Sequence, residues 1–228
     1  VTSWSHADLM TKALAPTDGD DVSGGSYDSD TINGGAGNDS LHGNDGHDTL
    51  TGGTGNDFLR GNHHNDLYRF SRGFGQDIVS DAGWGNSGAG DVIEFDSTIA
   101  PADITVERVG DALVLKVAGT DDRITIEATI SNSDYRIEAV RFVASDGTVT
   151  SWSHADLMTK ALAPTDGDDV SGGSYDSDTI NGGAGNDSLH GNDGHDTLTG
   201  GAGNDFLRGN HHNDLYRFSR GFGQDIVS

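Results

Sequence analysis

The chain has 228 residues, 35 glycines, no cysteine and a formal net charge of −24 that comes mostly from aspartate. This composition excludes a disulfide scaffold and a cysteine-based metal or redox site. It makes nucleic acid and anionic membranes unsuitable partners, since both are bound through Lys and Arg, and it favours cations. No apolar run reaches transmembrane length and no N-terminal signal peptide is found, so we expect no membrane insertion.

The chain contains a long internal duplication. Residues 1–80 recur at 149–228 with one difference, Thr54 against Ala202. The sequence therefore predicts the end of one module, a complete module and the start of another. The predicted segments are the end of a preceding module with a capping helix (1–16), a Gly/Asp-rich tract (17–80), a small β domain (81–150), a linking and capping helix (151–164) and a second tract (165–228).

The first predicted element is a short helix, encoded by SWSHADLMTKALA at 3–15 and again at 151–163. Ser5 and Asp8 fit a loose capping box. Leu9 and Leu14 belong to an apolar stripe with helical spacing, and Pro16 ends the helix. The same segment contains Ser, His and Asp, the residue types of a catalytic triad. A triad is defined by its spatial arrangement, and helix capping explains Ser5 and Asp8 more simply, so we do not predict catalysis here.

The two tracts repeat a nine-residue unit, G-G-x-G-x-D-x-U-x, in which U is apolar. A flexible linker would not hold Asp and an apolar residue in such a frame. The pattern predicts a three-residue strand alternating with a six-residue turn, so that two units close one coil. The U residues then stack as a thin core at an interstrand spacing of about 4.8 Å. In the first tract they are Ile32, Leu41, Leu50, Leu59 and Tyr68.

Turns 18 residues apart are predicted to stack on one edge of the coil. One edge then carries Asp30, Asp48 and Asp66, and the other carries Asp39 and Asp57. Two such charges about 4 Å apart repel by about 4 kcal/mol at an effective dielectric near 20, so a cation between the turns is expected. Ca²⁺ fits best because it accepts about 6–8 oxygens in a flexible geometry, whereas Mg²⁺ demands a tighter octahedron and transition metals prefer His or Cys.

Residues 81–150 have a different character. The stretches DVIEF, DITVERV, ALVLKVA, RITIEATI and YRIEAVRFV alternate apolar and polar residues, and VGDA, GTDD and SDGT separate some of them. These are strand and hairpin signals, so we predict a small β domain.

The nonapeptide pattern resembles the RTX family, a calcium-binding β-helix repeat. The resemblance is carried by three adjacent units in each tract, at 34–60 and 182–208, where Asn44 and Asn192 replace the second glycine of the middle unit. The region 81–150 also resembles the β domain often found after such repeats. The resemblance implies an all-β fold with two parallel β-rolls flanking a small β domain, short capping helices, and several Ca²⁺ ions per roll.

The resemblance also implies the ligands: the sixth-position Asp side chains and the backbone carbonyls of the second and fourth glycines. In the first tract these residues are Asp20 (in an offset first turn), Asp30, Gly35, Gly37, Asp39, Gly46, Asp48, Gly53, Gly55, Asp57, Asp66 and Asp77. In the second tract they are Asp168, Asp178, Gly183, Gly185, Asp187, Gly194, Asp196, Gly201, Gly203, Asp205, Asp214 and Asp225.

The sequence supports two other kinds of binding site less well than the calcium sites of the repeats. His42, His47, His63 and His64 lack the HExxH zinc motif, and we interpret them as solvated turn residues; the 12-residue EF-hand loop with its terminal Glu is also absent. The larger aromatic residues form either a carbohydrate platform or ordinary core packing, and we favour packing. These residues are Trp4, Tyr27, Phe74, Trp84, Tyr135 and Trp152.

We therefore expect a non-enzymatic, calcium-binding structural module of an exported RTX protein. By the resemblance, it leaves a Gram-negative cell by type I secretion and folds on Ca²⁺ outside. The alternative hypothesis is a calcium-dependent adhesion or carbohydrate-binding module whose partner is a cell surface or a polysaccharide.

Overall fold

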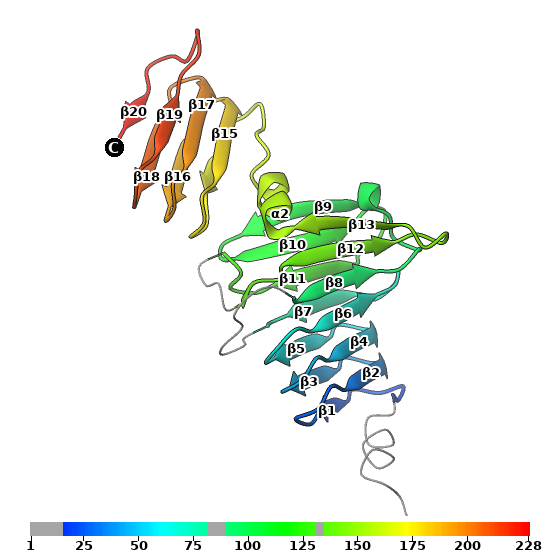
Figure 1. The fold of residues 1–228 in the computed structure, drawn as a ribbon. Coiled ribbons are helices and arrows are strands. Elements are labelled where there is room, and N and C mark those ends of the chain that lie inside the picture. The colour runs from blue at the N-terminus through cyan, green and yellow to red at the C-terminus, as the bar shows by residue number, and fades with distance from the viewer. Residues whose placement is uncertain (1–15, 82–89, 131–134) are drawn as a thin grey trace, which may run out of the picture. The chain divides into compact units, whose positions relative to one another are not determined.

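The computed structural model in Figure 1 describes residues 16–81, 90–130 and 135–228. Within these ranges the protein is almost entirely β-structure, with one α-helix and one 3₁₀ helix, which confirms the all-β class. The predicted helix at 3–15 lies outside the described residues. The described residues form two compact units. The first contains residues 16–81, 90–129 and 135–154, and the second contains Ile130 and residues 155–228.

In the first unit, short parallel strands alternate between two sheets (Figure 1). One sheet receives β1 (Val22–Gly24), β3 (Ser40–Asn44), β5 (Phe58–Asn62) and β7 (Gln76–Val79), and the other receives β2 (Thr31–Ala36), β4 (Thr49–Thr54) and β6 (Leu67–Phe70). Ile32 lies opposite Leu50, and Leu41 lies opposite Leu59. Two nine-residue units therefore make one coil, which confirms the predicted roll.

The predicted U residues form the core of this roll. Ile32, Leu41, Leu50, Leu59 and Tyr68 all have 0% of their surface exposed. The prediction of three-residue strands was wrong, because the strands of the complete units have five or six residues. Strand pairing continues past the apolar residue into the glycines of the next turn, which lengthens each strand.

The β domain extends both sheets of the roll. Its elements are β8 (Val92–Phe95), η1 (Pro101–Asp103), β9 (Ile104–Val109), β10 (Ala112–Val117), β11 (Arg123–Ile126), β12 (Ala139–Val143) and β13 (Val149–Ser153). β8 pairs in parallel with β6, and β11 pairs in parallel with β7. Antiparallel pairs then join β11 to β10 and β10 to β9 in one sheet, and β12 to β13 in the other. The five predicted stretches each contain one of the strands β8 to β12.

Aromatic rings join the last turn of the roll to this domain. Phe74 is 2% exposed, and its ring lies 5.0 Å from that of Phe70. Phe95 continues the cluster to Phe142 at 5.4 Å, and Phe142 meets Trp152 at 4.6 Å. Phe74 and Trp152 are thus packing residues, as predicted. Face-offset and edge contacts of this kind add about 0.5–1.5 kcal/mol each to area burial.

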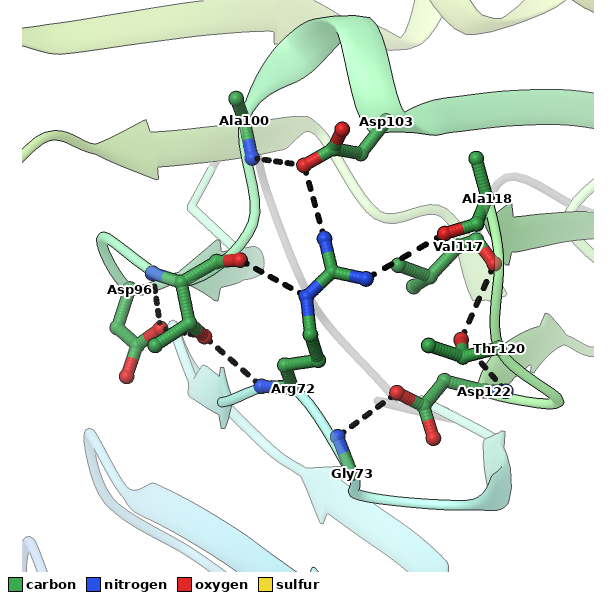
Figure 2. A network of polar contacts seen from close by, with 10 residues as sticks. Arg72, Gly73, Asp96, Ala100, Asp103, Val117, Ala118, Thr120 and Asp122 are labelled. Atoms are coloured by element: carbon green, nitrogen blue, oxygen red, sulfur yellow. Dashed lines mark hydrogen bonds and ion pairs between the residues drawn. The ribbon is translucent and has the colours of Figure 1, made fainter.

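Arg72 makes a second connection, shown in Figure 2. Its guanidinium donates to the Thr98 carbonyl at 3.1 Å, to the Ala118 carbonyl at 3.4 Å and to Asp103 Oδ2 at 2.9 Å. Nearby, the Asp122 carboxylate accepts the backbone N–H of Gly73 at 2.7 Å (Figure 2). The loop between β6 and β7 is therefore held by side chains of the β domain as well as by strand pairing.

The second unit contains a roll built in the same way. One sheet has β14 (Val170–Gly172), β16 (Ser188–Asn192), β18 (Phe206–Asn210) and β20 (Ile226–Val227), and the other has β15 (Thr179–Ala184), β17 (Thr197–Ala202) and β19 (Leu215–Arg217). Leu198 lies opposite Ile180, and Leu207 lies opposite Leu189. The coil of 18 residues is therefore preserved.

The helix before this roll begins later than predicted. The structure has α2 at His154–Ala161, while residues 151–153 end β13, which pairs with β12. The predicted apolar stripe is correct, since Leu157, Met158 and Leu162 are buried. No helix in the described ranges has the length and hydropathy needed to cross a bilayer.

Candidate calcium sites between the turns

The sixth-position aspartates form a ladder along each edge of the first roll. On one edge, the Asp30 N–H donates to Asp48 Oδ1 and the Asp48 N–H donates to Asp66 Oδ1, both at 2.8 Å. On the other edge, the Asp39 N–H donates to Asp57 Oδ1 at 2.8 Å. The predicted edge assignment is therefore confirmed, and each carboxylate is fixed to the turn that precedes it by 18 residues.

Both ladders extend further than the nonapeptides. Asp77, which the local pattern Gly-x-Gly-x-Asp singles out, lies 20 residues after Asp57, and its Oδ1 accepts the N–H of Asp57 at 2.9 Å. Asp91 Oδ1 accepts the N–H of Asp66 at 2.8 Å, and Glu138 Oε2 accepts the N–H of Asp91 at 3.0 Å. The repeat pattern does not predict Asp91, because Asp91 lies 25 residues after Asp66 and only the pairing of β6 with β8 brings it into the ladder.

The first turn of each roll required a correction. Counting nine residues back from Asp30 reaches Asp21, and Asp21 donates its N–H to Asp39 Oδ1 at 2.8 Å. Asp20 instead occupies the fifth position, where its Oδ1 accepts the N–H of Asn38 at 2.7 Å. The second roll repeats this arrangement with Asp169 in the ladder and Asp168 beside it. Because two aspartates are adjacent in each first turn, the local pattern alone does not show which of them occupies the sixth position.

Each ladder bond occupies one carboxylate oxygen and leaves the other in the interior of the turn. Oδ2 is buried without a hydrogen-bond partner in Asp39, Asp48, Asp57, Asp66, Asp77, Asp187, Asp196, Asp205 and Asp225. A buried acceptor left without a donor costs about 1–3 kcal/mol, and more when it is charged. A row of such oxygens therefore requires protons or cations.

The first glycine of each unit leaves room beside this oxygen. A Cβ placed on Gly43 would lie 2.2 Å from Asp48 Oδ2 and 2.7 Å from the Gly61 carbonyl oxygen of the next same-edge turn. A Cβ on Gly34 would lie 2.1 Å from Asp39 Oδ2, with a carbonyl of the next turn again at 2.7 Å. At these two glycines the Asp Oδ2 and a carbonyl oxygen of the next same-edge turn thus lie close to each other beside the glycine Cα. Both are hard oxygen ligands of the kind that Ca²⁺ binds.

The second and fourth glycines serve a different purpose. Gly35 and Gly37 have φ of 106° and 120°, a backbone region that glycine adopts readily. Their carbonyl oxygens lie 1.9 and 1.8 Å from where a Cβ on Gly53 and Gly55 would stand, so they point toward the next same-edge turn. The other predicted glycines also have positive φ; these are Gly46, Gly53, Gly55, Gly183, Gly185, Gly194, Gly201 and Gly203.

Burial raises the pKa of these aspartates. The pKa of Asp66 and of Asp77 rises to about 8, first because of burial and then because of neighbouring carboxylates. Burial raises the pKa of Asp196 to about 6 and also shifts the pKa of Asp48 and Asp57 upward. In the absence of a cation, these carboxyl groups therefore resist ionisation.

The turns at the roll ends differ from the central ones. Asp30 Oδ2 accepts the N–H of Ser26 at 2.6 Å and the Ser26 hydroxyl at 2.9 Å, and Asp178 has the same bonds with Ser174. These two aspartates therefore offer an oxygen that is already bonded, because Ser replaces the second glycine. Asp214 is partly exposed.

The other candidate sites do not assemble. Among the described residues, no histidine belongs to a group of three metal-ligating side chains. His47 stacks loosely on His64, with ring centroids 5.6 Å apart, and His63 faces Asp45 at 3.8 Å. Of the aromatic residues considered for a carbohydrate platform, Tyr27 is 86% exposed. The others that the structure describes are buried or half-buried, and Trp4 and Trp84 fall outside the described residues.

The geometry defines a class of protein: a parallel β-roll whose stacked turns gather oxygen ligands for a hard cation. The model of the RTX calcium-binding nonapeptide repeat (4 copies) matches residues 17–50, 24–59, 42–77, 165–198, 172–207 and 190–225. These stretches cover more than half of the chain, which therefore belongs to this family. A second model, the haemolysin-type calcium binding protein related domain, matches residues 113–156. The repeat family is structural and calcium-binding, not enzymatic.

Two individual proteins are similar to parts of the chain. The iron-regulated protein FrpA of Neisseria meningitidis serogroup C is 34% identical over 121 residues, which are 52% of this chain and 10% of FrpA. The chain thus spans about a tenth of that relative. The extracellular lipase LipA of Serratia marcescens aligns in structure with a TM-score of 0.35 and 25% identity, over 89% of this chain and 29% of the lipase. A TM-score this low carries no argument about activity.

Proposed function

We propose that the chain is a structural module of an exported protein, and that its rolls fold when Ca²⁺ binds between same-edge turns. The observation that carries this proposal is the row of buried Asp Oδ2 atoms without hydrogen-bond partners. In Asp39, Asp48, Asp187 and Asp196 this oxygen lies near a carbonyl oxygen of the next same-edge turn. Two acceptors that face one space attract a cation.

The ligands proposed for each site are the sixth-position Asp carboxylates and the carbonyl oxygens of nearby glycines. The first glycine of the next same-edge turn supplies one carbonyl, as Gly61 does for Asp48. The second and fourth glycines supply others. When bound, Ca²⁺ accepts these oxygens and neutralises the stacked carboxylates. Since all donors are oxygens and the turns contain flexible glycines, Ca²⁺ is preferred over Mg²⁺ and over transition metals.

Binding and folding are coupled because the metal-free roll has little to hold it together. Each unit buries one apolar residue in its centre, while carboxylates repeat along each edge at about 4.8 Å. Two unit charges at that separation repel by about 3–4 kcal/mol at an effective dielectric near 20. The free energy of metal binding therefore becomes free energy of folding, and each filled coil stabilises its neighbours.

We also infer that the parent protein is exported. High negative charge and many glycines keep a metal-free tract extended, a state suited to passage through a secretion channel. Folding then waits for a compartment with abundant Ca²⁺.

Circular dichroism of the chain in chelator, in Ca²⁺ and in Mg²⁺ tests the coupling. We expect strand content to appear with Ca²⁺, to be lost on chelation and to be much lower with Mg²⁺ at the same concentration. Equal strand content in all three conditions would show that the rolls fold without Ca²⁺.

A further inference from the structure

A cluster of three buried carboxylates lies where the first roll meets the β domain. Asp66 precedes β6, Asp81 lies two residues after β7, and Asp91 immediately precedes β8. One carboxylate oxygen from each lies within 4.8 Å of the other two. The three residues are only 1%, 1% and 3% exposed. Asp81 and Asp91 lie outside the nonapeptide repeats.

Apart from a proton that Asp81 and Asp91 are close enough to share, the hydrogen bonds of this cluster leave oxygens available for a ligand. Asp66 and Asp91 each use Oδ1 in the ladder, and Asp81 uses Oδ1 to accept the N–H of Asn62 at 3.1 Å. The Oδ2 atoms of Asp66 and Asp81 are buried without a hydrogen-bond partner. Two unpartnered carboxylate oxygens therefore lie in a space that a third carboxylate borders.

We propose that Asp66, Asp81 and Asp91 form a calcium site at the junction of the roll and the β domain. It rests on the proposed function, because Asp66 also belongs to the ladder of the repeats. Oxygens on opposite sides of a Ca²⁺ ion lie about 4.8 Å apart when each bond is about 2.4 Å, so one ion reaches all three residues. Mg²⁺ binds at about 2.1 Å and requires an octahedron, and the cluster has no His or Cys for a transition metal.

This site differs from the inter-turn sites in its consequence. Its ligands come from the last nonapeptide turn, from the segment after β7 and from the segment before β8. An ion there ties the strand pair β6–β8 at its end, beside the ladder bond from Asp66 to Asp91. Calcium therefore joins the β domain to the roll, in addition to closing the coils.

Asp81→Asn in the full chain tests the site, because the amide retains the Oδ1 acceptor for Asn62 and removes one charged ligand. The measurement is the number of Ca²⁺ ions per chain, by equilibrium dialysis with metal analysis, together with strand content. We expect the loss of one ion with strand content kept. Asp91→Asn should give the same loss. Asp146→Asn, at an exposed turn of the β domain, is the charge-matched control and should keep every ion.

The outcomes separate this proposal from the proposed function. A wild-type chain that binds no Ca²⁺ would contradict both. A wild-type chain that binds Ca²⁺, with an unchanged ion number in Asp81→Asn and Asp91→Asn, would overturn the junction site alone. Loss of several ions together with strand content in both variants would also contradict a local site.

Discussion

Replacing Asp48 by Asn should have opposite effects with and without calcium. Asp48 is 1% exposed; its Oδ1 accepts the N–H of Asp30, and its Oδ2 lies beside the Gly61 carbonyl oxygen. The amide keeps the first bond and places an N–H₂ donor next to that carbonyl. In the metal-free chain it removes an unsatisfied acceptor worth about 1–3 kcal/mol. It also removes repulsion from Asp66 in the next turn. Asp48→Asn should therefore stabilise the metal-free roll.

In calcium the variant should be less stable than the wild-type chain, because it loses a charged ligand and presents a hydrogen-bond donor to the ion. We expect the Ca²⁺ concentration at half folding to rise tenfold or more, at about 1.4 kcal/mol for each factor of ten. Circular dichroism during a Ca²⁺ titration measures this midpoint. The stability of the metal-free roll is measured in chelator by adding increasing sucrose, since excluded osmolytes favour the compact state.

The control for this experiment is Asp28→Asn, an exposed acid on the same edge of the roll. It removes the same charge and should shift the Ca²⁺ midpoint little. If Asp48→Asn destabilised the chain equally in chelator and in calcium, Asp48 would be a structural acceptor only, and the ion-site reasoning would be wrong.

Three further predictions concern the turns, the protons and the β domain. Gly34→Ala should abolish binding of the neighbouring ion or destabilise the roll by about 1–3 kcal/mol through overpacking, because the new Cβ would occupy the space next to a carboxylate. The control is Gly19→Ala, since a Cβ there meets no atom within 4 Å and the residue has no positive φ. This control should leave the Ca²⁺ titration unchanged. Acid should stabilise the metal-free roll. The pKa of Asp66 is raised to about 8 in the folded chain, from about 3.9 in the unfolded chain. The contribution of protonated Asp66 to folding stability is therefore complete below about pH 4 and is lost as the pH rises through about 8. Strand content in chelator should thus increase from pH 9 to pH 5, and a decrease would refute this sign. Arg72→Ala should lower the midpoint of thermal unfolding in calcium by several degrees, at about 2–4 °C per kcal/mol, whereas Arg220→Ala, at the exposed copy in the second roll, should not.

The roll was predictable because its information is local and periodic. A nine-residue frame places Leu41 inward and Asp39 on an edge without reference to distant residues, and the structure confirms both placements. The same frame, applied to DGDD, would have identified Asp21 in place of Asp20. Asp20 and Asp21 are adjacent and chemically equivalent, so only the nine-residue count distinguishes them.

The junction was not predictable, because its contacts depend on tertiary pairing. Asp91 joins the ladder 25 residues after Asp66, and the pairing of β6 with β8 sets that offset. Nothing in the segment around Asp81 repeats. The helix start was misplaced for a similar reason: residues 151–153 have helix-capping letters, but pairing with β12 holds them as a strand. Tertiary contacts here override local preference.

The continuous sheets also imply a direction of folding. Parallel strands far apart in the chain are slow to pair, because loop entropy is lost before contacts form. The β domain, whose β9, β10 and β11 are joined by local antiparallel pairs, presents β8 and β11 as edges on which β6 and β7 can form. We therefore expect the β domain to act as a folding nucleus, so that the order of strands in the two sheets predicts the order in which they form. In the first roll, β6 and β7 are then expected to form first, followed by β4 and β5 and then by β2 and β3, and the calcium sites are expected to fill in the same order.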